Sequence, residues 1–228
     1  MRYENIEKGT FIKRPNRFIA HVLVDGKEEI VHVKNTGRCK EILKEGATVI
    51  LERASNPNRK TRYSIIAAYK DRLLINIDSQ VPNDVIYNVL KEGLLTEFGH
   101  PLEVKKEVTY RNSRFDLYCN NQNGVSFTEV KGVTLEQEGK AMFPDAPTER
   151  GRKHILEMIQ AVEEGYQGYI FFLIQFQGAK YFTPNEKTDP EFAKALRLAK
   201  ERGVKILAYD SLVTENSIKL NQEIPVIL

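Results

Sequence analysis

The chain has 228 residues, of which 41% are hydrophobic and 29% are charged. This composition excludes a disordered protein and provides apolar side chains for one large core or two small ones, and we expect two compact units. The formal charge of +3 and the pI near 8.7 are only mildly basic, so net charge does not by itself indicate a nucleic-acid partner.

The sequence also argues against membrane and zinc-cluster proteins. The most apolar run, residues 169–174, is too short to span a bilayer, and the first five residues are polar. Cys39 and Cys119 are too few for a zinc cluster; we expect both to be reduced, with a single disulfide left open. We therefore expect a cytoplasmic protein that does not associate with membranes.

Residues 10–77 have the pattern of a small β-barrel. Asp25-Gly26 is a typical hairpin turn, and residues 39–43 have helical spacing. Strands with one short helix among them are typical of an OB-fold, although periodicity alone allows another small barrel. The expected strands are residues 10–12, 18–24, 29–34, 48–52, 63–69 and 73–77.

Three polar loops of this first unit carry basic side chains. If the loops lie on one side of the barrel, they form a positive surface for phosphates. The alternative is that their Gly, Asn and Pro residues only make solvated turns. The candidate nucleic-acid-binding residues are Arg14, Arg17, Asn35, Thr36, Arg38, Arg59 and Lys60.

A polar segment that contains a proline, residues 78–84, is the expected domain boundary. Asn83 or Asp84 is suited to cap the helix that follows. We divide the chain into an OB-like nucleic-acid-binding domain, residues 1–80, and a second domain, residues 81–228.

The second domain has the order helix, three strands, helix, strand, helix, strand, which predicts an α/β layer with a mixed sheet. Residues 136–140 are expected to form a polar loop. The nearly continuous apolar run at residues 169–175 is typical of a buried central strand.

A hairpin expected at residues 114–131 places charged side chains where strands usually carry apolar ones. Because side chains alternate between the faces of a strand, Asp116, Glu129 and Lys131 can converge at one end of the hairpin. Two carboxylates there offer oxygen ligands to Mg²⁺ or Mn²⁺, and Lys131 can orient the attacking water in phosphodiester hydrolysis. The alternative is an ordinary cross-strand ion pair, worth about 0.2–1 kcal/mol if exposed.

Basic side chains also gather at the start of a helix that begins after Thr148. Cations oppose the helix dipole at this end, so Arg150, Arg152 and Lys153 are candidates to hold phosphates. The alternative is a solvated basic face with His154 packed against the sheet. Further acidic residues that are left open as metal ligands are Glu92, Glu97, Glu107 and Asp145.

The acidic hairpin resembles a known motif. Asp116 with Glu129-Val130-Lys131 resembles the Asp…Glu-x-Lys motif of restriction-endonuclease-like, or PD-(D/E)xK, nucleases. Together with residues 132–135 and 143–154, it resembles the sugar fermentation stimulation protein A (SfsA) family over the whole chain. The resemblance implies an OB-like N-terminal domain, a restriction-endonuclease-like C-terminal domain and DNA binding.

For function, the resemblance implies a metal-dependent DNA hydrolase site. Asp116, Glu129 and the Val130 carbonyl would hold Mg²⁺ or Mn²⁺, with Lys131 as the third catalytic residue. The alternative is a DNA-binding regulator of sugar-metabolism genes that does not cleave DNA. Single- or double-stranded DNA is the expected partner, RNA is less favoured, and a homodimer would suit the cutting of both strands.

Overall fold

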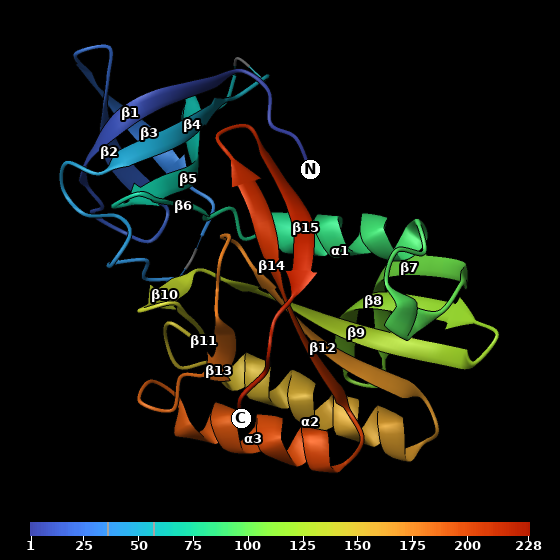
Figure 1. Cartoon of the computed structure of the whole chain (residues 1–228). Coiled ribbons are helices and arrows are strands. Elements are labelled where there is room, and N and C mark those ends of the chain that lie inside the picture. The colour runs from blue at the N-terminus through green and yellow to red at the C-terminus, as the bar shows by residue number, and fades with distance from the viewer. Residues whose placement is uncertain (36, 57) are drawn as a thin grey trace.

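The computed structural model describes residues 1–35, 37–56 and 58–228 (Figure 1). The first six strands form one sheet, which closes through a parallel pairing of β3 with β5. The expected OB-like barrel is therefore confirmed. Its strands are β1 (Ile6–Lys13), β2 (Ile19–Val24), β3 (Lys27–Val33), β4 (Thr48–Arg53), β5 (Tyr63–Lys70) and β6 (Leu73–Asn76).

Turns explain one confirmed prediction and one wrong prediction in the barrel. Asp25 and Gly26 have φ angles of 48° and 77°, as a two-residue hairpin turn requires. The helix expected at residues 39–43 is wrong: Leu43 N donates to Cys39 O at 2.9 Å in a single turn. Gly46, with φ of 83°, follows shortly, and one turn alone is too short to propagate as a helix.

The second domain contains the expected mixed sheet. Its strand order is β15-β14-β12-β9-β8-β7; β9, β12 and β14 run parallel, and the outer neighbours are antiparallel. Its helices are α1 (Val81–Lys91), η1 (Thr96–Phe98), α2 (Glu149–Glu163) and α3 (Pro190–Glu201). Its strands are β7 (Pro101–Tyr110), β8 (Ser113–Asn121), β9 (Gly124–Val133), β10 (Leu135–Gln137), β11 (Lys140–Phe143), β12 (Gln167–Ile174), β13 (Tyr181–Pro184), β14 (Lys205–Thr214) and β15 (Ser217–Glu223).

Helices cover both faces of this sheet (Figure 1). Along β12, Tyr169, Phe171 and Leu173 belong to the core that contains α1, whereas Phe172 and Ile174 belong to the core that contains α2 and α3. All five side chains are fully buried. The prediction of a buried central strand is confirmed, and each such side chain contributes roughly 1.5–3 kcal/mol by leaving water.

The polar loop expected at residues 136–140 is instead the turn of a short hairpin. Leu135 on β10 pairs with Met142 on β11, and Glu138 and Gly139 have positive φ angles of 55° and 85°. β11 also pairs in parallel with β13, which forms a small three-stranded sheet. Polar composition hid this hairpin, because its turn residues are common in loops as well.

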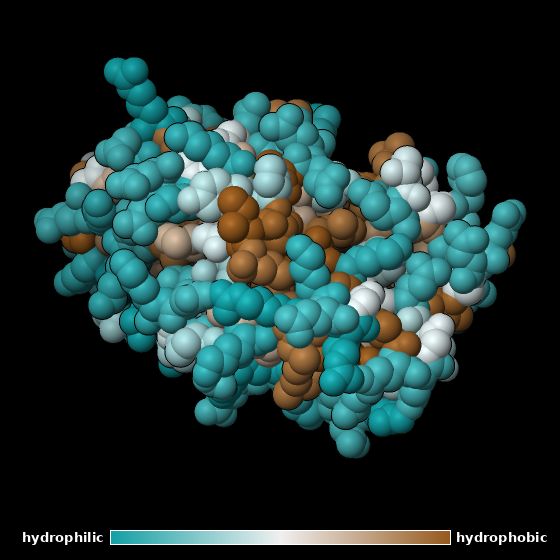
Figure 2. All heavy atoms as spheres, turned by 60° about the horizontal axis from the view of Figure 1, so that its bottom comes forward, coloured by the Kyte–Doolittle hydropathy of each residue, from teal (hydrophilic) through white to brown (hydrophobic). Residues whose placement is uncertain are grey.

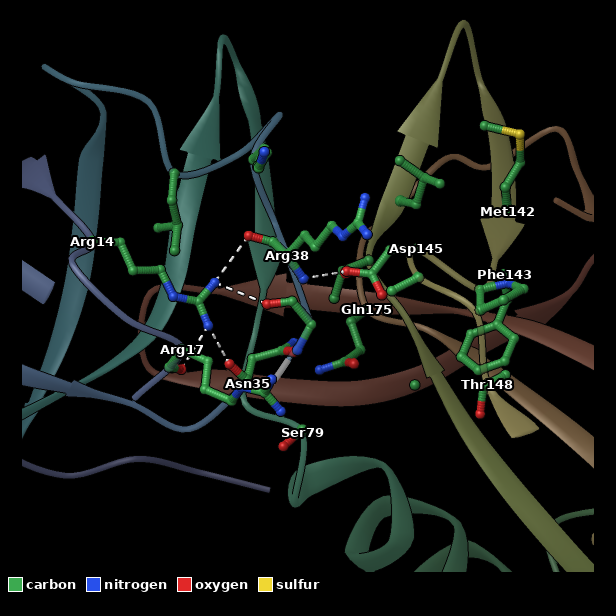
Figure 3. A pocket seen from close by; sticks show the side chains of 18 of the residues that line it. Arg14, Arg17, Asn35, Arg38, Ser79, Met142, Phe143, Asp145, Thr148 and Gln175 are labelled. Carbon is green, nitrogen blue, oxygen red and sulfur yellow. Dashed lines mark hydrogen bonds between the residues drawn. The ribbon is translucent and has the colours of Figure 1, made fainter. Parts of the chain in front are cut away.

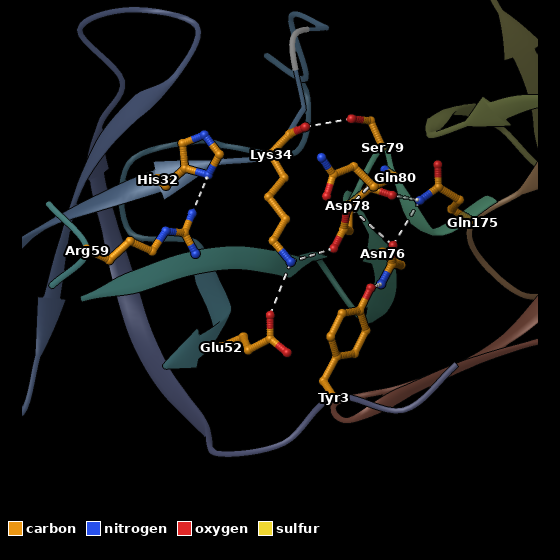
Figure 4. Close-up of polar contacts among 10 residues, drawn as sticks. All are labelled: Tyr3, His32, Lys34, Glu52, Arg59, Asn76, Asp78, Ser79, Gln80 and Gln175. Carbon is orange, nitrogen blue, oxygen red and sulfur yellow. Dashed lines mark hydrogen bonds and ion pairs between the residues drawn. The ribbon is translucent and has the colours of Figure 1, made fainter. Parts of the chain in front are cut away.

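Polar contacts join the barrel to the second domain. Gln175 Nε2 donates to Asn76 Oδ1 at 2.8 Å, and within the first domain Lys34 Nζ lies 2.9 Å from Asp78 Oδ2, in the segment that leads into α1 (Figure 4). The amino group of Met1 also bonds to a carbonyl of β15 at 2.9 Å. The contacts of Gln175 and Met1 connect residues before and after position 80. The division of the chain at this position stays a prediction.

The face that carries α2 and α3 is mostly hydrophilic, with a hydrophobic area near its middle (Figure 2). None of the helices in the described part of the chain has the length and apolar character that crossing a lipid bilayer requires.

Candidate active site

Asp116 lies where β8 and β9 stop pairing. Their antiparallel register ends at Leu117, and beyond it Asp116 Oδ2 accepts a hydrogen bond from Val130 N at 2.8 Å. Asn83 Nδ2, in the first turn of α1, donates to Asp116 Oδ1 at 2.9 Å. Burial, and next the charge of Glu129, raises the pKa of Asp116. The site therefore disfavours the ionised form of this carboxyl unless a cation is near.

Glu129 on β9 is only 2% exposed. Its Oε1 accepts from Lys131 Nζ and from His154 Nδ1, the latter at 2.5 Å. Burial acts to raise the pKa of Glu129, but Lys131 and then His154 outweigh it, so this pKa lies below its ordinary value. Its Oε2 is buried and has no hydrogen-bond partner among the described residues. One oxygen of Glu129 is thus fixed, and the other is available to a ligand.

His154 packs against the sheet, as one of the two sequence alternatives had it, and its contact with Glu129 is what the sequence did not predict. It lies on α2 and is 7% exposed, on the face that also buries Ile155 and Met158. Thr148 begins this helix by accepting from Gly151 N at 3.0 Å, as its position before the helix predicts. The sequence signal for a site residue here is a titratable side chain within the apolar stripe of the helix. At such a position a histidine is more often a packed core residue than a ligand or a positioning residue.

The donor set of this site fits a hard divalent cation. No group of three His, Cys, Asp or Glu side chains suited to a metal occurs in the described ranges. Asp116 and Glu129 would therefore be the side-chain ligands, with the Val130 carbonyl as a third, and other positions would be left to water and phosphate. A buried carboxylate oxygen without a partner costs about 1–3 kcal/mol, and a cation would relieve this penalty.

The other acidic candidates have different positions. Asp145 Oδ2 accepts from Arg38 N at 2.7 Å, and Glu97 Oε1 accepts from Tyr209 OH at 2.7 Å. Glu107 lies 3.4 Å from Arg114 and is largely exposed. Asp145 therefore contacts the barrel, and Glu97 contacts β14.

The basic residues of α2 lie in its first two turns. Arg150 and Lys153 are exposed, and Arg152 is half-buried. Lys153 Nζ reaches Asn112 O at 3.3 Å and Glu157 at 3.8 Å. These residues share a helix with His154, which contacts Glu129, and their role in holding phosphates stays a prediction.

A cavity of about 1080 Å³ lies between the barrel and the second domain (Figure 3). Four of the predicted nucleic-acid-binding residues, Arg14, Arg17, Asn35 and Arg38, line it from the barrel. Gly132, which also lines it, directly follows Lys131. The cavity therefore reaches the backbone next to Lys131, and the side chains of Asp116, Glu129 and Lys131 are not among its described lining residues.

Arg14 connects the first two basic loops of the barrel. Its guanidinium donates to the carbonyl oxygens of Arg17 at 2.7 Å, Asn35 at 2.6 Å, and Gly37 and Arg38 at 2.9 Å each. The structure thus brings these two loops side by side. The Arg14 guanidinium is occupied by backbone carbonyl oxygens of loop residues that line the cavity.

The third basic loop lies elsewhere. Arg59 and Lys60 are exposed, and Arg59 Nη2 lies 3.4 Å from His32 Nδ1 (Figure 4). Neither is among the described residues that line the cavity. Thr36, another predicted contact, lies outside the described residues.

This is a two-domain protein in which an OB-type barrel is followed by a mixed-sheet α/β domain. The second domain carries the carboxylate pair of Asp116 and Glu129. The family model described as SfsA N-terminal OB domain matches residues 12–77, and the one described as Sugar fermentation stimulation protein RE domain matches residues 80–217. The chain belongs to the sugar fermentation stimulation protein family.

Known proteins agree over the full length. The sugar fermentation stimulation protein homolog of Clostridium botulinum (strain Loch Maree / Type A3) is 56% identical over 227 residues, which cover 98% of this chain and 97% of that protein. The homolog of Alkaliphilus oremlandii is 50% identical over 231 residues, covering 99% and 98%. The structure of Pyrococcus furiosus SfsA in complex with Ca²⁺ matches with a TM-score of 0.92 at 28% identity, covering 100% of this chain and 98% of that one. These matches confirm the family resemblance and the fold.

Proposed function

We propose that this protein is a nuclease that hydrolyses DNA phosphodiester bonds with Mg²⁺ or Mn²⁺. The observation that carries the proposal is the pair of half-buried Asp116 and buried Glu129, in which Glu129 Oε2 has no partner among the described residues. The charge of Glu129 raises the pKa of Asp116, so the two carboxylates repel each other, and one cation between them would relieve this repulsion. The Ca²⁺ in the related Pyrococcus furiosus structure supports a divalent-cation site.

The roles of the side chains follow from their contacts. Val130 N holds Asp116, and His154 holds one oxygen of Glu129, so both carboxylates are oriented before a ligand arrives. A bound cation supplies Lewis-acid activation of the phosphodiester and makes a bound water more acidic. Lys131 Nζ lies beside Glu129, where it would orient the attacking water and stabilise negative charge on the phosphate.

Basic side chains on both domains would hold the DNA backbone. Arg150, Arg152 and Lys153 lie at the start of α2, the helix that also carries His154, and Arg17 and Arg38 line the cavity from the barrel. Phosphate contacts of this kind position the substrate without reading its sequence. The proposal therefore includes no base specificity.

The test is incubation of the purified protein with labelled single- and double-stranded DNA, with and without Mn²⁺ or Mg²⁺. We expect metal-dependent cleavage that Asp116→Ala abolishes. Glu191→Ala serves as the control, because Glu191 is an exposed residue of α3 paired with Lys194. Binding without cleavage in the wild type would instead support a DNA-binding regulator, and cleavage that persists in Asp116→Ala would refute the site.

A further inference from the structure

The cavity between the domains has two walls of different chemistry. On the barrel side, Arg17, Arg38 and Lys40 line it with exposed cationic side chains. On the α/β side, apolar side chains form a continuous stretch of the lining, next to the polar residues Thr134, Asp145, Thr148 and Gln175; the apolar residues are Leu135, Met142, Phe143, Pro144 and Pro147. Figure 3 shows Arg17 and Arg38 on one side of the cavity and Met142 and Phe143 on the other.

We propose that this cavity holds a single strand of DNA and leads it to the carboxylate pair. The inference rests on the proposed function, since the strand would be the substrate of that site. Gly132 lines the cavity and is bonded to Lys131, so a strand held here reaches the β9 backbone from which Glu129 and Lys131 project.

The difference between the walls is the reason for preferring one strand to a duplex. A duplex stacks its bases inside and offers charged phosphates on its outer surface, so the wall of Met142 and Phe143 would face charge. A single strand presents phosphates on one side and unstacked bases on the other. Base contacts with an aromatic ring contribute about 1–3 kcal/mol per base. The two walls match these two sides.

Phe143 is already held in place for such a contact. Its ring packs against Phe172, with centroids 5.8 Å apart, and against Phe192, at 5.2 Å. The residue nevertheless stays partly exposed at the cavity. A base that packs on it therefore meets an oriented ring, and little side-chain entropy is lost on binding.

The two walls are fastened to each other. Asp145 Oδ2 accepts from Arg38 N at 2.7 Å, and a Cβ atom on Gly37 would lie 2.6 Å from the same oxygen. The only carboxylate among the described lining residues is thus engaged by the barrel backbone. A close bridge between the walls suits a thin strand better than a wide duplex.

Binding without metal tests the inference separately from cleavage. We would measure fluorescence anisotropy of a labelled oligo(dT) and of a duplex of equal length, in a chelating buffer and over a range of salt. We expect tighter binding of the single strand. Arg38→Gln should weaken it several-fold and reduce the salt slope by about 0.7, the value for one phosphate contact on a single strand.

Lys27→Gln is the matched control, since Lys27 is exposed at the start of β3 and is not among the described lining residues. It should leave single-strand binding unchanged. Duplex binding as tight as single-strand binding, or an Arg38→Gln variant that binds like Lys27→Gln, would overturn the inference.

A second measurement locates the bases. Oligo(dT) carrying 5-iodouracil, irradiated on the wild type, should crosslink to the peptide that contains Met142 and Phe143, and crosslinks confined to the outer barrel would overturn the inference. Metal-dependent cleavage of duplex alone would leave the proposed function intact and remove the single-strand cavity. Single-strand binding without any cleavage would leave the single-strand cavity intact and remove the proposed function.

Discussion

Lys131→Met isolates the charge that stabilises Glu129. The Glu129 side chain is 2% exposed and that of Lys131 is 16% exposed. Removing one partner of a fully buried ion pair costs about 3–5 kcal/mol. Because Lys131 is partly solvated and His154 still bonds the same oxygen, we expect a smaller loss of unfolding free energy, about 2 kcal/mol.

The loss should depend on pH in a defined direction. The folded-state pKa of Glu129 lies below its ordinary value of 4.5, so this group stabilises the fold above that pH and loses its contribution as pH falls through the folded value. The deficit of Lys131→Met should therefore be largest at neutral pH and should narrow below pH 4.5.

Urea unfolding in chelating buffer at a series of pH values measures the deficit, and a cleavage assay with Mn²⁺ should show lost activity. Lys194→Met is the control: Lys194 pairs with Glu191 on the surface, with side chains 69% and 54% exposed. Such pairs contribute roughly 0–1 kcal/mol. If both variants were equally stable at neutral pH, our account of Glu129 would be wrong.

Three further predictions concern Asp116, His154 and Arg14. Asp116→Asn keeps one of the two acceptor oxygens that Asn83 and Val130 use, but it removes an ionised form that folding disfavours, as the raised pKa of Asp116 shows. The unfolding free energy of this variant relative to the wild type should therefore be higher at neutral pH than below pH 3.8, where the wild type is protonated both folded and unfolded; urea unfolding of the metal-free proteins against pH checks this. His154→Ala should weaken Ca²⁺ or Mn²⁺ binding about tenfold in calorimetric titration, and unchanged affinity would contradict its positioning of Glu129. Arg14→Ala should lower the unfolding free energy by about 2–3 kcal/mol, because backbone carbonyls of two loops lose their donor, with Arg14→Lys intermediate; a wild-type midpoint in urea would show that other contacts hold the loops.

Sequence patterns predicted the turn and the helix starts whose conformation depends on residues close in sequence. Asp25-Gly26 makes its turn because these residues accept positive φ, and Thr148 begins α2 because its hydroxyl satisfies a free N–H of the first turn. Asp189 does the same for α3 by accepting from Phe192 N at 2.9 Å. The helix expected at residues 39–43 was wrong, since spacing over five residues does not distinguish one turn from a helix.

The chain by itself therefore determined the strands and turns of the barrel, the order of elements in the second domain and the acidic hairpin, because turn propensity and hydrophobic period act between residues close in sequence; the family resemblance, and not periodicity, selected the OB-fold among small barrels. Tertiary structure alone decided what surrounds the hairpin. His154 meets Glu129 across 25 positions, and Arg38 meets Asp145 across 107. No local pattern encodes such pairs, since they arise only when a helix packs on the sheet and one domain closes on another. Those long-range contacts leave one oxygen of Glu129 without a partner among the described residues, and they set basic side chains of the barrel opposite Met142 and Phe143.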